Sequence, residues 1–190
     1  MAELNFLLHT FIQVLAAVVA IFLLRYLMQL VRADFRNPFA QFVVKVTNPL
    51  VLPLRRFLPP VGRTDSASVV AVLLVQLAVT ALGFILLGAR LPPIGALAGT
   101  AITELLSTVL SLYQLMIFAY VLMSWVSTAG YNPMSRLLGQ LCEPVLGPFR
   151  RALPNLGGLD ISPVVVLFLI EFLRVVLHSR IAPLLQDLLG

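Results

Sequence analysis

The chain has 190 residues, of which 60% are hydrophobic and only 11% are charged. Soluble domains carry about 25% charged residues, and so few charges cannot cover the surface of a soluble protein of this length. The composition therefore excludes an ordinary soluble domain and predicts an all-α integral membrane protein. One cysteine excludes an internal disulfide, and two histidines leave little for a metal site.

Four runs are predicted to be transmembrane helices, each of which needs about 20 apolar residues to cross the bilayer. They cover residues 4–24, 69–89, 105–129 and 163 to about 181, the last interrupted by Glu171 and Arg174. The first run has no Lys or Arg before it, unlike a signal peptide, so we interpret it as a retained span.

Charge sets the predicted orientation. Nine of the 13 Lys and Arg residues fall in the two connections that follow the first and third spans. The positive-inside rule places such connections in the cytoplasm and both chain ends on the opposite side. Because these cations lie beside long apolar runs, we expect them to face an anionic membrane surface and not a nucleic acid.

The two basic connections are copies of each other, because a shift of 95 residues aligns them without a gap. Ten identities fall between positions 37 and 65, mostly at Asn, Pro, Gly and charged residues. They pair Asn37 with Asn132, Pro38 with Pro133, Pro49 with Pro144, Pro53 with Pro148, Arg55-Arg56 with Arg150-Arg151, Leu58-Pro59 with Leu153-Pro154, Gly62 with Gly157 and Asp65 with Asp160. The chain is therefore predicted to consist of two parallel repeats, residues 1–95 and 96–190, each a hairpin of two spans around a cytoplasmic loop.

Each loop is predicted to begin with an amphipathic helix of about ten residues that lies in the membrane interface. Asn37 and Asn132 suit the N-cap, and the proline after each suits the first helical position. The apolar stripes are Phe39, Phe42, Val43 and Val46 in the first loop and Met134, Leu137, Leu138 and Leu141 in the second. A segment interrupted by prolines follows, and it carries the arginine pair before a turn at Gly62 or Gly157.

Two groups of charged residues are candidate sites. The pairs Arg55-Arg56 and Arg150-Arg151 can bind anionic lipid headgroups or an acidic partner, pair with Asp65 and Asp160, or serve only as a topology signal. In the fourth span, Glu171 and Arg174 share a helix face.

The repeat shift places Gln76 of the second span at the position of Glu171. These intramembrane polar residues predict either a structural contact between the second and fourth spans or an ion path. The eight carboxylates are scattered and form no catalytic pattern, so we predict neither an enzyme nor a bound cofactor.

The duplicated pattern of Asn-Pro, Pro-x-x-x-Pro-x-Arg-Arg, Leu-Pro, Gly and Asp resembles the YggT family of bacterial inner-membrane proteins, over nearly the whole chain. That family also favours an Arg before an apolar run that ends near Ser-Trp. Arg25 matches in the first copy, whereas the second copy has Tyr120 with Ser124-Trp125 intact. The first copy instead has Gln29-Leu30, and Ala67-Ser68 stands where the second has Ser162-Pro163, so the two copies are not expected to form equivalent sites.

The resemblance implies a factor for membrane assembly or homeostasis in the inner membrane. In that membrane, the orientation predicted from the cations places both chain ends in the periplasm. Members of the family are linked to osmotic stress tolerance and ion uptake, to division-site or nucleoid organisation and, in plastids, to haem attachment on a membrane cytochrome. We therefore predict an accessory or scaffold protein whose arginine-bearing loops contact anionic lipids, a membrane-protein partner or a second copy. The alternatives are an oligomeric channel or transporter subunit lined by Gln76, Glu171 and Arg174, and a cytochrome or haem assembly factor.

Overall fold

The computed structural model describes residues 2–60, 65–126, 132–153 and 160–189. Within these ranges all regular elements are helical, which confirms the predicted class. The turn predicted at Gly62 and Gly157 lies outside the described residues. The elements are α1 (Ala2–Leu30), α2 (Pro38–Phe57), α3 (Ser66–Leu86), α4 (Ile94–Val126), α5 (Pro133–Ala152), α6 (Ser162–Val176), the π-helical segment η1 (Leu177–Ile181) and α7 (Ala182–Leu189).

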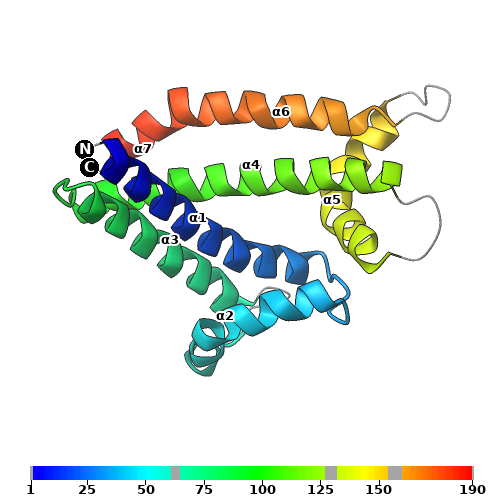
Figure 1. Cartoon of the computed structure of the whole chain (residues 1–190), viewed down its shortest axis with the longest axis horizontal. Coiled ribbons are helices and arrows are strands. Elements are labelled where there is room, and N and C mark those ends of the chain that lie inside the picture. Colours follow the sequence, from blue (N-terminus) through cyan, green and yellow to red (C-terminus); the bar gives the residue numbers. More distant parts are fainter. Residues whose placement is uncertain (1, 61–64, 127–131, 154–159, 190) are drawn as a thin grey trace.

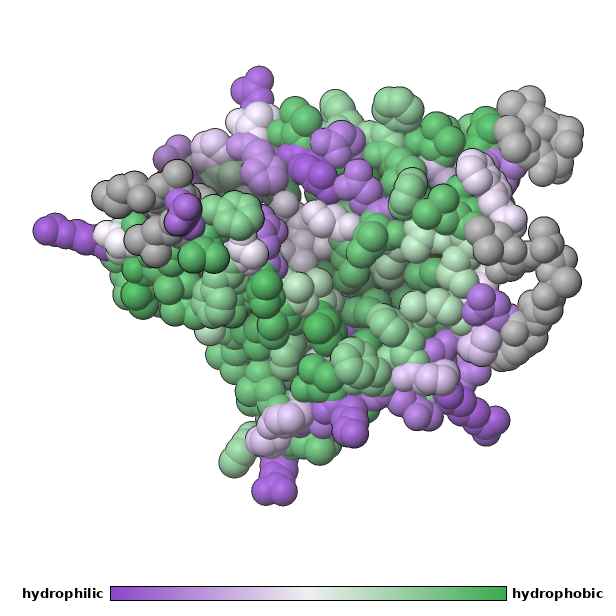
Figure 2. All heavy atoms as spheres, in the orientation of Figure 1, coloured by the Kyte–Doolittle hydropathy of each residue, from purple (hydrophilic) through white to green (hydrophobic). Residues whose placement is uncertain are grey.

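Three of the described helices are long and apolar enough to cross a membrane. These segments are Phe6–Leu30, Ser66–Leu86 and Ile94–Trp125. They overlap the first three spans predicted from the sequence. Figure 2 shows hydrophobic side chains over much of the visible face, with hydrophilic side chains mainly along its margins. Side chains such as Phe6, which is 69% exposed, therefore suit contact with lipid, and the chain has the surface of a membrane protein.

The fourth predicted span is a helix that changes geometry part of the way along. Helix α6 has 15 residues and continues through the π-helical segment η1 into α7. Pro183 accounts for the change, because its missing N–H and its ring disturb the turn that precedes it. A 15-residue helix rises only about 23 Å, which is less than the ~30 Å of the hydrocarbon core. Apolarity alone predicted the span and did not reveal this division.

The helices form two groups that meet along α4. Helix α1 packs against α3, and α4 packs against α6 and α7, while α1 and α3 both also contact α4. Figure 1 shows α1 beginning and α7 ending at the same end of the molecule, with α2 and α5 at the other end. The buried core lies toward α2 and α5. It includes Leu23 and Met28 of α1, Ala71 of α3, Ile117 of α4 and Leu141 of α5.

Helices α2 and α5 are each 20 residues long, so the prediction of a helix of about ten residues was wrong. Both helices continue through their two internal prolines, which are Pro49 and Pro53 in α2 and Pro144 and Pro148 in α5. All four prolines lie on the exposed side, where a carbonyl freed by the missing N–H is not sealed in the protein core. Packing of the opposite face against the bundle keeps the helix continuous.

The apolar stripes of the two helices differ in their surroundings. In α5, Leu137, Leu138 and Leu141 are buried against the bundle. In α2, the predicted stripe contains buried Val43 but also Phe42, which is 55% exposed. The face of α2 that packs inward consists of Ala40, Val43, Thr47 and Val51. The apolar stripe predicted for α2 therefore differs from its buried face, and part of the stripe points away from the protein.

Candidate functional site

The first candidate site is built around Arg25, which lies near the end of α1 and is only 2% exposed. Its Nη1 donates to the Val44 carbonyl oxygen at 3.2 Å, to the Thr47 hydroxyl at 2.6 Å and to the Asn48 amide oxygen at 2.9 Å. Thr47 in turn donates to the carbonyl oxygen of Val43. The buried guanidinium of α1 therefore holds α2 by hydrogen bonds to three oxygen atoms that carry no formal charge.

Asp65, at the start of α3, accepts hydrogen bonds from three elements on a single oxygen. Arg55 of α2 donates to Asp65 Oδ2 from Nη2 at 2.6 Å and from Nε at 3.2 Å. Gln29 of α1 donates to that oxygen at 3.2 Å, and Ser68 of α3 at 2.6 Å. Burial raises the pKa of Asp65, but the hydrogen bonds from Arg55, Ser68 and Gln29 and the charge of Arg55 outweigh it, so the pKa is lowered overall. Asp65 is therefore an ionised junction between α1, α2 and α3.

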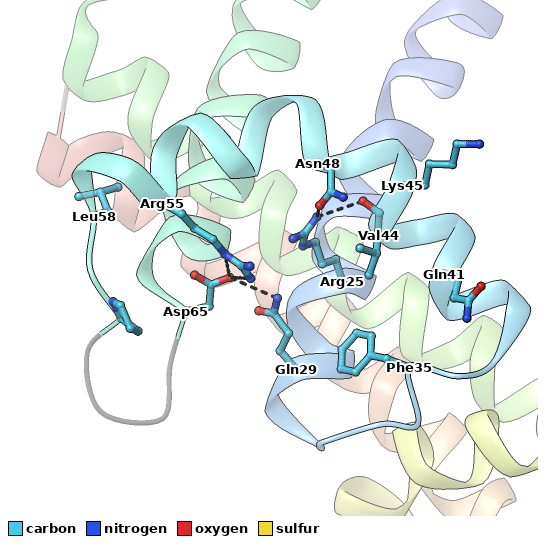
Figure 3. A pocket seen from close by; sticks show the side chains of 11 residues that line it. Arg25, Gln29, Phe35, Gln41, Val44, Lys45, Asn48, Arg55, Leu58 and Asp65 are labelled. Atoms are coloured by element: carbon cyan, nitrogen blue, oxygen red, sulfur yellow. Dashed lines mark hydrogen bonds and ion pairs between the residues drawn. The ribbon is translucent and has the colours of Figure 1, made fainter.

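A pocket of about 990 Å³ opens beside these residues (Figure 3). Arg25, Gln29, Asn48, Arg55 and Asp65 line it. In Figure 3, Arg55 and Gln29 point toward Asp65, while Arg25 points toward α2. The pocket also has an apolar part, formed by Phe35, Val44 and Leu58. A further cation, Lys45, is among the lining residues, and its side chain extends away from Asp65 in Figure 3. The arrangement can bind a polar, negatively charged group.

The second repeat arranges its charges differently around Arg150 of α5. This guanidinium donates to Asp160 Oδ2 at 2.8 Å from Nε and to Glu143 Oε2 at 2.8 Å from Nη1. It also lies 3.3 Å from the Tyr120 hydroxyl and 5.6 Å from the centre of the Tyr120 ring. Burial lowers the pKa of Arg150, but Asp160 and Tyr120 raise it by more, so the pKa is raised overall. The cation is held by two carboxylates and an aromatic face.

The two arginines of each pair differ in their surroundings. Arg55 and Arg150 turn to the aspartates ten positions later, as one of the three interpretations of the sequence expected. Arg56 and Arg151 are exposed, and neither has an ion pair or hydrogen bond with any residue that the structure describes. Phe57, next to Arg56, is 81% exposed. Arg56 and Arg151 are thus not engaged by the part of the chain that the structure describes.

The Asn-Pro motifs begin the two loop helices as predicted. Asn37 accepts from the N–H of Phe39, and Asn132 accepts from the N–H of Met134, so both amides cap their helices. Pro38 and Pro133 occupy the first helical positions. Asn37 also contacts Pro133 itself, which joins the starts of α2 and α5.

The polar residues that were predicted to lie within the membrane do not converge on one path. Arg174 contacts Glu171 at 3.2 Å on its own helix and donates to Gln114 of α4 at 2.6 Å. Gln76 is buried and donates to Thr80, one turn further along α3. The expected polar contact between the second and fourth spans is thus replaced by one between α4 and α6, because α4 lies beside α6.

Sequence reasoning missed Thr47, Asn48 and Glu143 as site residues. Their signal was present in the repeat shift, which places Asn48 at the position of Glu143 and Arg25 at that of Tyr120. The search for identical residues between the two copies passed over these positions, because the two copies have different residues there. Within the described ranges, no three His, Cys, Asp or Glu side chains lie close enough to hold a metal ion.

Comparison with known proteins gives a consistent result. The profile of the CCB3/YggT family matches residues 1–86 and 99–181. The uncharacterized protein YggT of Escherichia coli K12 is 39% identical over 186 residues, which cover 98% of this chain and 93% of that protein. The uncharacterized protein PA0392 of Pseudomonas aeruginosa is 39% identical over 163 residues, which cover 85% of this chain and 83% of that protein.

A plant protein is similar over a shorter stretch. YlmG homolog protein 2, chloroplastic, of Arabidopsis thaliana is 30% identical over 82 residues, which cover 42% of this chain and 31% of that protein. No solved structure matches the chain.

Proposed function

The chain belongs to the CCB3/YggT family, and from this premise we propose that it is an accessory or scaffold protein of the bacterial inner membrane. In this proposal the protein has four membrane spans, and the fourth is the continuous run of α6, η1 and α7. It places both chain ends in the periplasm and α2 and α5 at the cytoplasmic leaflet. In this arrangement α2 and α5 present cations to anionic lipid headgroups or to an acidic segment of a partner.

One observation supports this function above the others. Arg55 and Arg150 are held by Asp65 and Asp160, while the neighbouring Arg56 and Arg151 are exposed at the ends of their helices. Exposed cations beside an exposed aromatic side chain such as Phe57 suit the headgroup region, where cations near anionic lipid contribute about 1 kcal/mol each. The two exposed cations, one on each helix, give a surface that acts without any catalytic step.

Lipid enrichment around the protein tests the proposal. The full chain is placed in vesicles of phosphatidylglycerol and phosphatidylcholine and extracted with a styrene–maleic acid copolymer, and the lipid in the discs is measured. We expect enrichment of phosphatidylglycerol that falls in the double variant Arg56→Gln/Arg151→Gln. Arg90→Gln, which removes an exposed cation between α3 and α4, is the matched control and should keep the enrichment. Equal enrichment in all three proteins would reject the lipid role.

A second measurement addresses topology and partners. Fusion of a reporter that is active only in the periplasm to the carboxyl end should give activity, and insertion of the same reporter after Gln41 of α2 should not. Crosslinking in cells followed by mass spectrometry would then identify proteins that contact α2 or α5. Contacts restricted to lipids would leave the membrane itself as the partner.

A further inference from the structure

The two repeats place opposite charge at equivalent positions. At the five positions of Arg25, Lys45, Asn48, Arg55 and Asp65, the first repeat has three cations and one carboxylate, a net charge of +2. At the same five positions the second repeat has Tyr120, Gln140, Glu143, Arg150 and Asp160, one cation and two carboxylates, a net charge of −1. Both repeats pair an arginine with an aspartate, but only the second adds another carboxylate, Glu143, to that arginine. At the position of Glu143 the first repeat has the neutral Asn48, which accepts from Arg25.

Arg25 is the cation that this difference leaves uncompensated. The oxygen atoms within hydrogen-bonding distance of its Nη1 belong to a carbonyl, a hydroxyl and an amide. Its Nε is buried and has no partner among the described residues. A buried charge that meets only neutral acceptors is costly, and a buried donor without an acceptor adds to that cost. The cost of the buried charge falls when an anion occupies the adjoining pocket, which Arg25 lines.

We propose that the pocket between α1, α2 and Asp65 binds the phosphate headgroup of an anionic phospholipid. The inference rests on the proposed placement of α2 at the lipid headgroups. Guanidinium forks and ammonium groups are the usual ligands of phosphate oxygens. Arg25, Arg55 and Lys45 line the pocket. The Lys45 side chain extends away from Asp65 in Figure 3, and rotation about its flexible stem would turn its ammonium toward a ligand.

The size and lining of the pocket favour a lipid over a small ion. Its volume of about 990 Å³ is far larger than one phosphate needs. Phe35, Val44 and Leu58 provide an apolar wall that suits the glycerol and first acyl carbons. Arg25 lies within the last turns of a helix that is long enough to span, which is the depth of the headgroups. The phosphate of the bound lipid would supply the first repeat with a negative charge, as the Glu143 carboxylate does in the second repeat.

Titration of a short-chain lipid into the purified full chain tests the site. Dihexanoyl-phosphatidylglycerol is titrated by calorimetry below its micelle concentration, in an uncharged detergent, with dihexanoyl-phosphatidylcholine and inorganic phosphate as separate arms. We expect one phosphatidylglycerol per chain, with phosphatidylcholine and phosphate much weaker. Equal binding of phosphatidylcholine would overturn recognition of the anionic headgroup. Phosphate that binds as tightly as the lipid would overturn the lipid as the occupant.

The decisive variant is Asn48→Glu, which gives the first repeat the carboxylate of the second. It should weaken phosphatidylglycerol binding roughly tenfold or more, because the new carboxylate takes the place of the ligand beside Arg25. Glu143→Gln removes the corresponding group from the second repeat and should leave binding unchanged. Lys45→Gln changes an exposed side chain, so it tests the pocket even if Asn48→Glu fails to fold, and it should weaken binding several-fold. Unchanged binding in the pocket variants that fold would reject the site.

The same titration separates this inference from the proposed function. Arg56→Gln/Arg151→Gln leaves the pocket intact, so it should keep tight binding of the short-chain lipid while it loses enrichment in vesicles. If the double variant keeps its enrichment and Asn48→Glu loses binding, the pocket is supported and the surface role is rejected. If Asn48→Glu binds as wild type and the double variant loses enrichment, the reverse holds.

Discussion

Asn37 joins the two halves of the chain, because its Nδ2 donates to the backbone oxygen of Pro133 at 2.7 Å across 96 positions of sequence. The same amide accepts from the N–H of Phe39 through Oδ1. Close by, the N–H of Asp34 donates to the Gln140 side chain at 3.1 Å. One buried side chain therefore begins α2 and fixes the start of α5 against it.

Asn37→Asp separates these two roles. The carboxylate retains the capping acceptor, but it places an oxygen opposite the Pro133 carbonyl and removes the donor. We expect the free energy of unfolding to fall by about 1–3 kcal/mol, measured by reversible unfolding in mixed detergent and dodecyl sulfate. The exposed cap Asn132→Asp is the control, with a change within about 0.5 kcal/mol. Equal losses in the two variants would mean that the bond between repeats is unimportant.

Stability should depend on acid through Asp65. The pKa of Asp65 is lowered in the folded protein from its ordinary value of 3.8, so the ionised carboxyl stabilises the fold above that value. This contribution is lost as the pH falls through the lowered pKa of the folded state. Between pH 6 and pH 3 we expect the free energy of unfolding to fall more steeply in the wild type than in Asp65→Asn, followed by unfolding at each pH. Parallel curves would contradict this role.

The backbone at Arg32 offers a stabilising substitution. Arg32 ends α1 with a φ of 53°, where the N–H of Ala33 bonds to the Met28 carbonyl. Gly88 ends α3 in the same way with a φ of 68°, and a Cβ there would meet nothing within 4 Å. Left-handed backbone favours glycine. Arg32→Gly should therefore raise, and Gly88→Ala lower, the free energy of unfolding by roughly 0.5–1 kcal/mol. Changes of the same sign would contradict the backbone explanation.

Arg174 should stabilise the contact between α4 and α6. Its Nη2 lies 2.6 Å from the Gln114 amide oxygen and 3.3 Å from the Ser111 hydroxyl. Hydrogen bonds between membrane helices contribute roughly 0.6 kcal/mol on average and up to about 1.7 kcal/mol. Arg174→Met should lower the free energy of unfolding by roughly 1–2 kcal/mol, with exposed Arg180→Met as the control. A double-mutant cycle with Gln114→Leu that gives no coupling would disprove the contact.

Cys142 should report on unfolding. The thiol is 1% exposed, and burial raises its pKa to about 12, although Arg150 acts in the opposite direction. A neutral, buried thiol is inert, so a maleimide at pH 8 should label Cys142 only after dodecyl sulfate unfolds the chain. The variant Cys142→Ser/Gln41→Cys moves the thiol to the exposed face of α2 and should be labelled in the folded state. Rapid labelling of folded wild type would show that α5 opens readily.

Much of the fold was predictable because it depends on local chemistry. The Asn-Pro caps at Asn37 and Asn132 and the apolar runs of α1, α3 and α4 are read within a few residues. The lengths of α2 and α5 were not predictable in this way. Pro49 and Pro144 are helix breakers by propensity, and only packing of the opposite face of each helix overrides them.

The candidate site was likewise predictable only in part. Proximity of Arg55 to Asp65 and of Arg150 to Asp160 was one of several sequence interpretations, because ten residues of separation allow contact without requiring it. That Arg25 reaches Thr47 and Asn48 depends on how α2 folds back onto α1, which no local pattern encodes.

By itself the sequence determined the helical class, the long apolar helices and the Asn-Pro caps, since each follows from composition or from residues close together in the chain. Only the tertiary structure decided which cation is buried, which is paired and which is exposed, because the free energy of a charge depends on the neighbours and solvent that folding gives it.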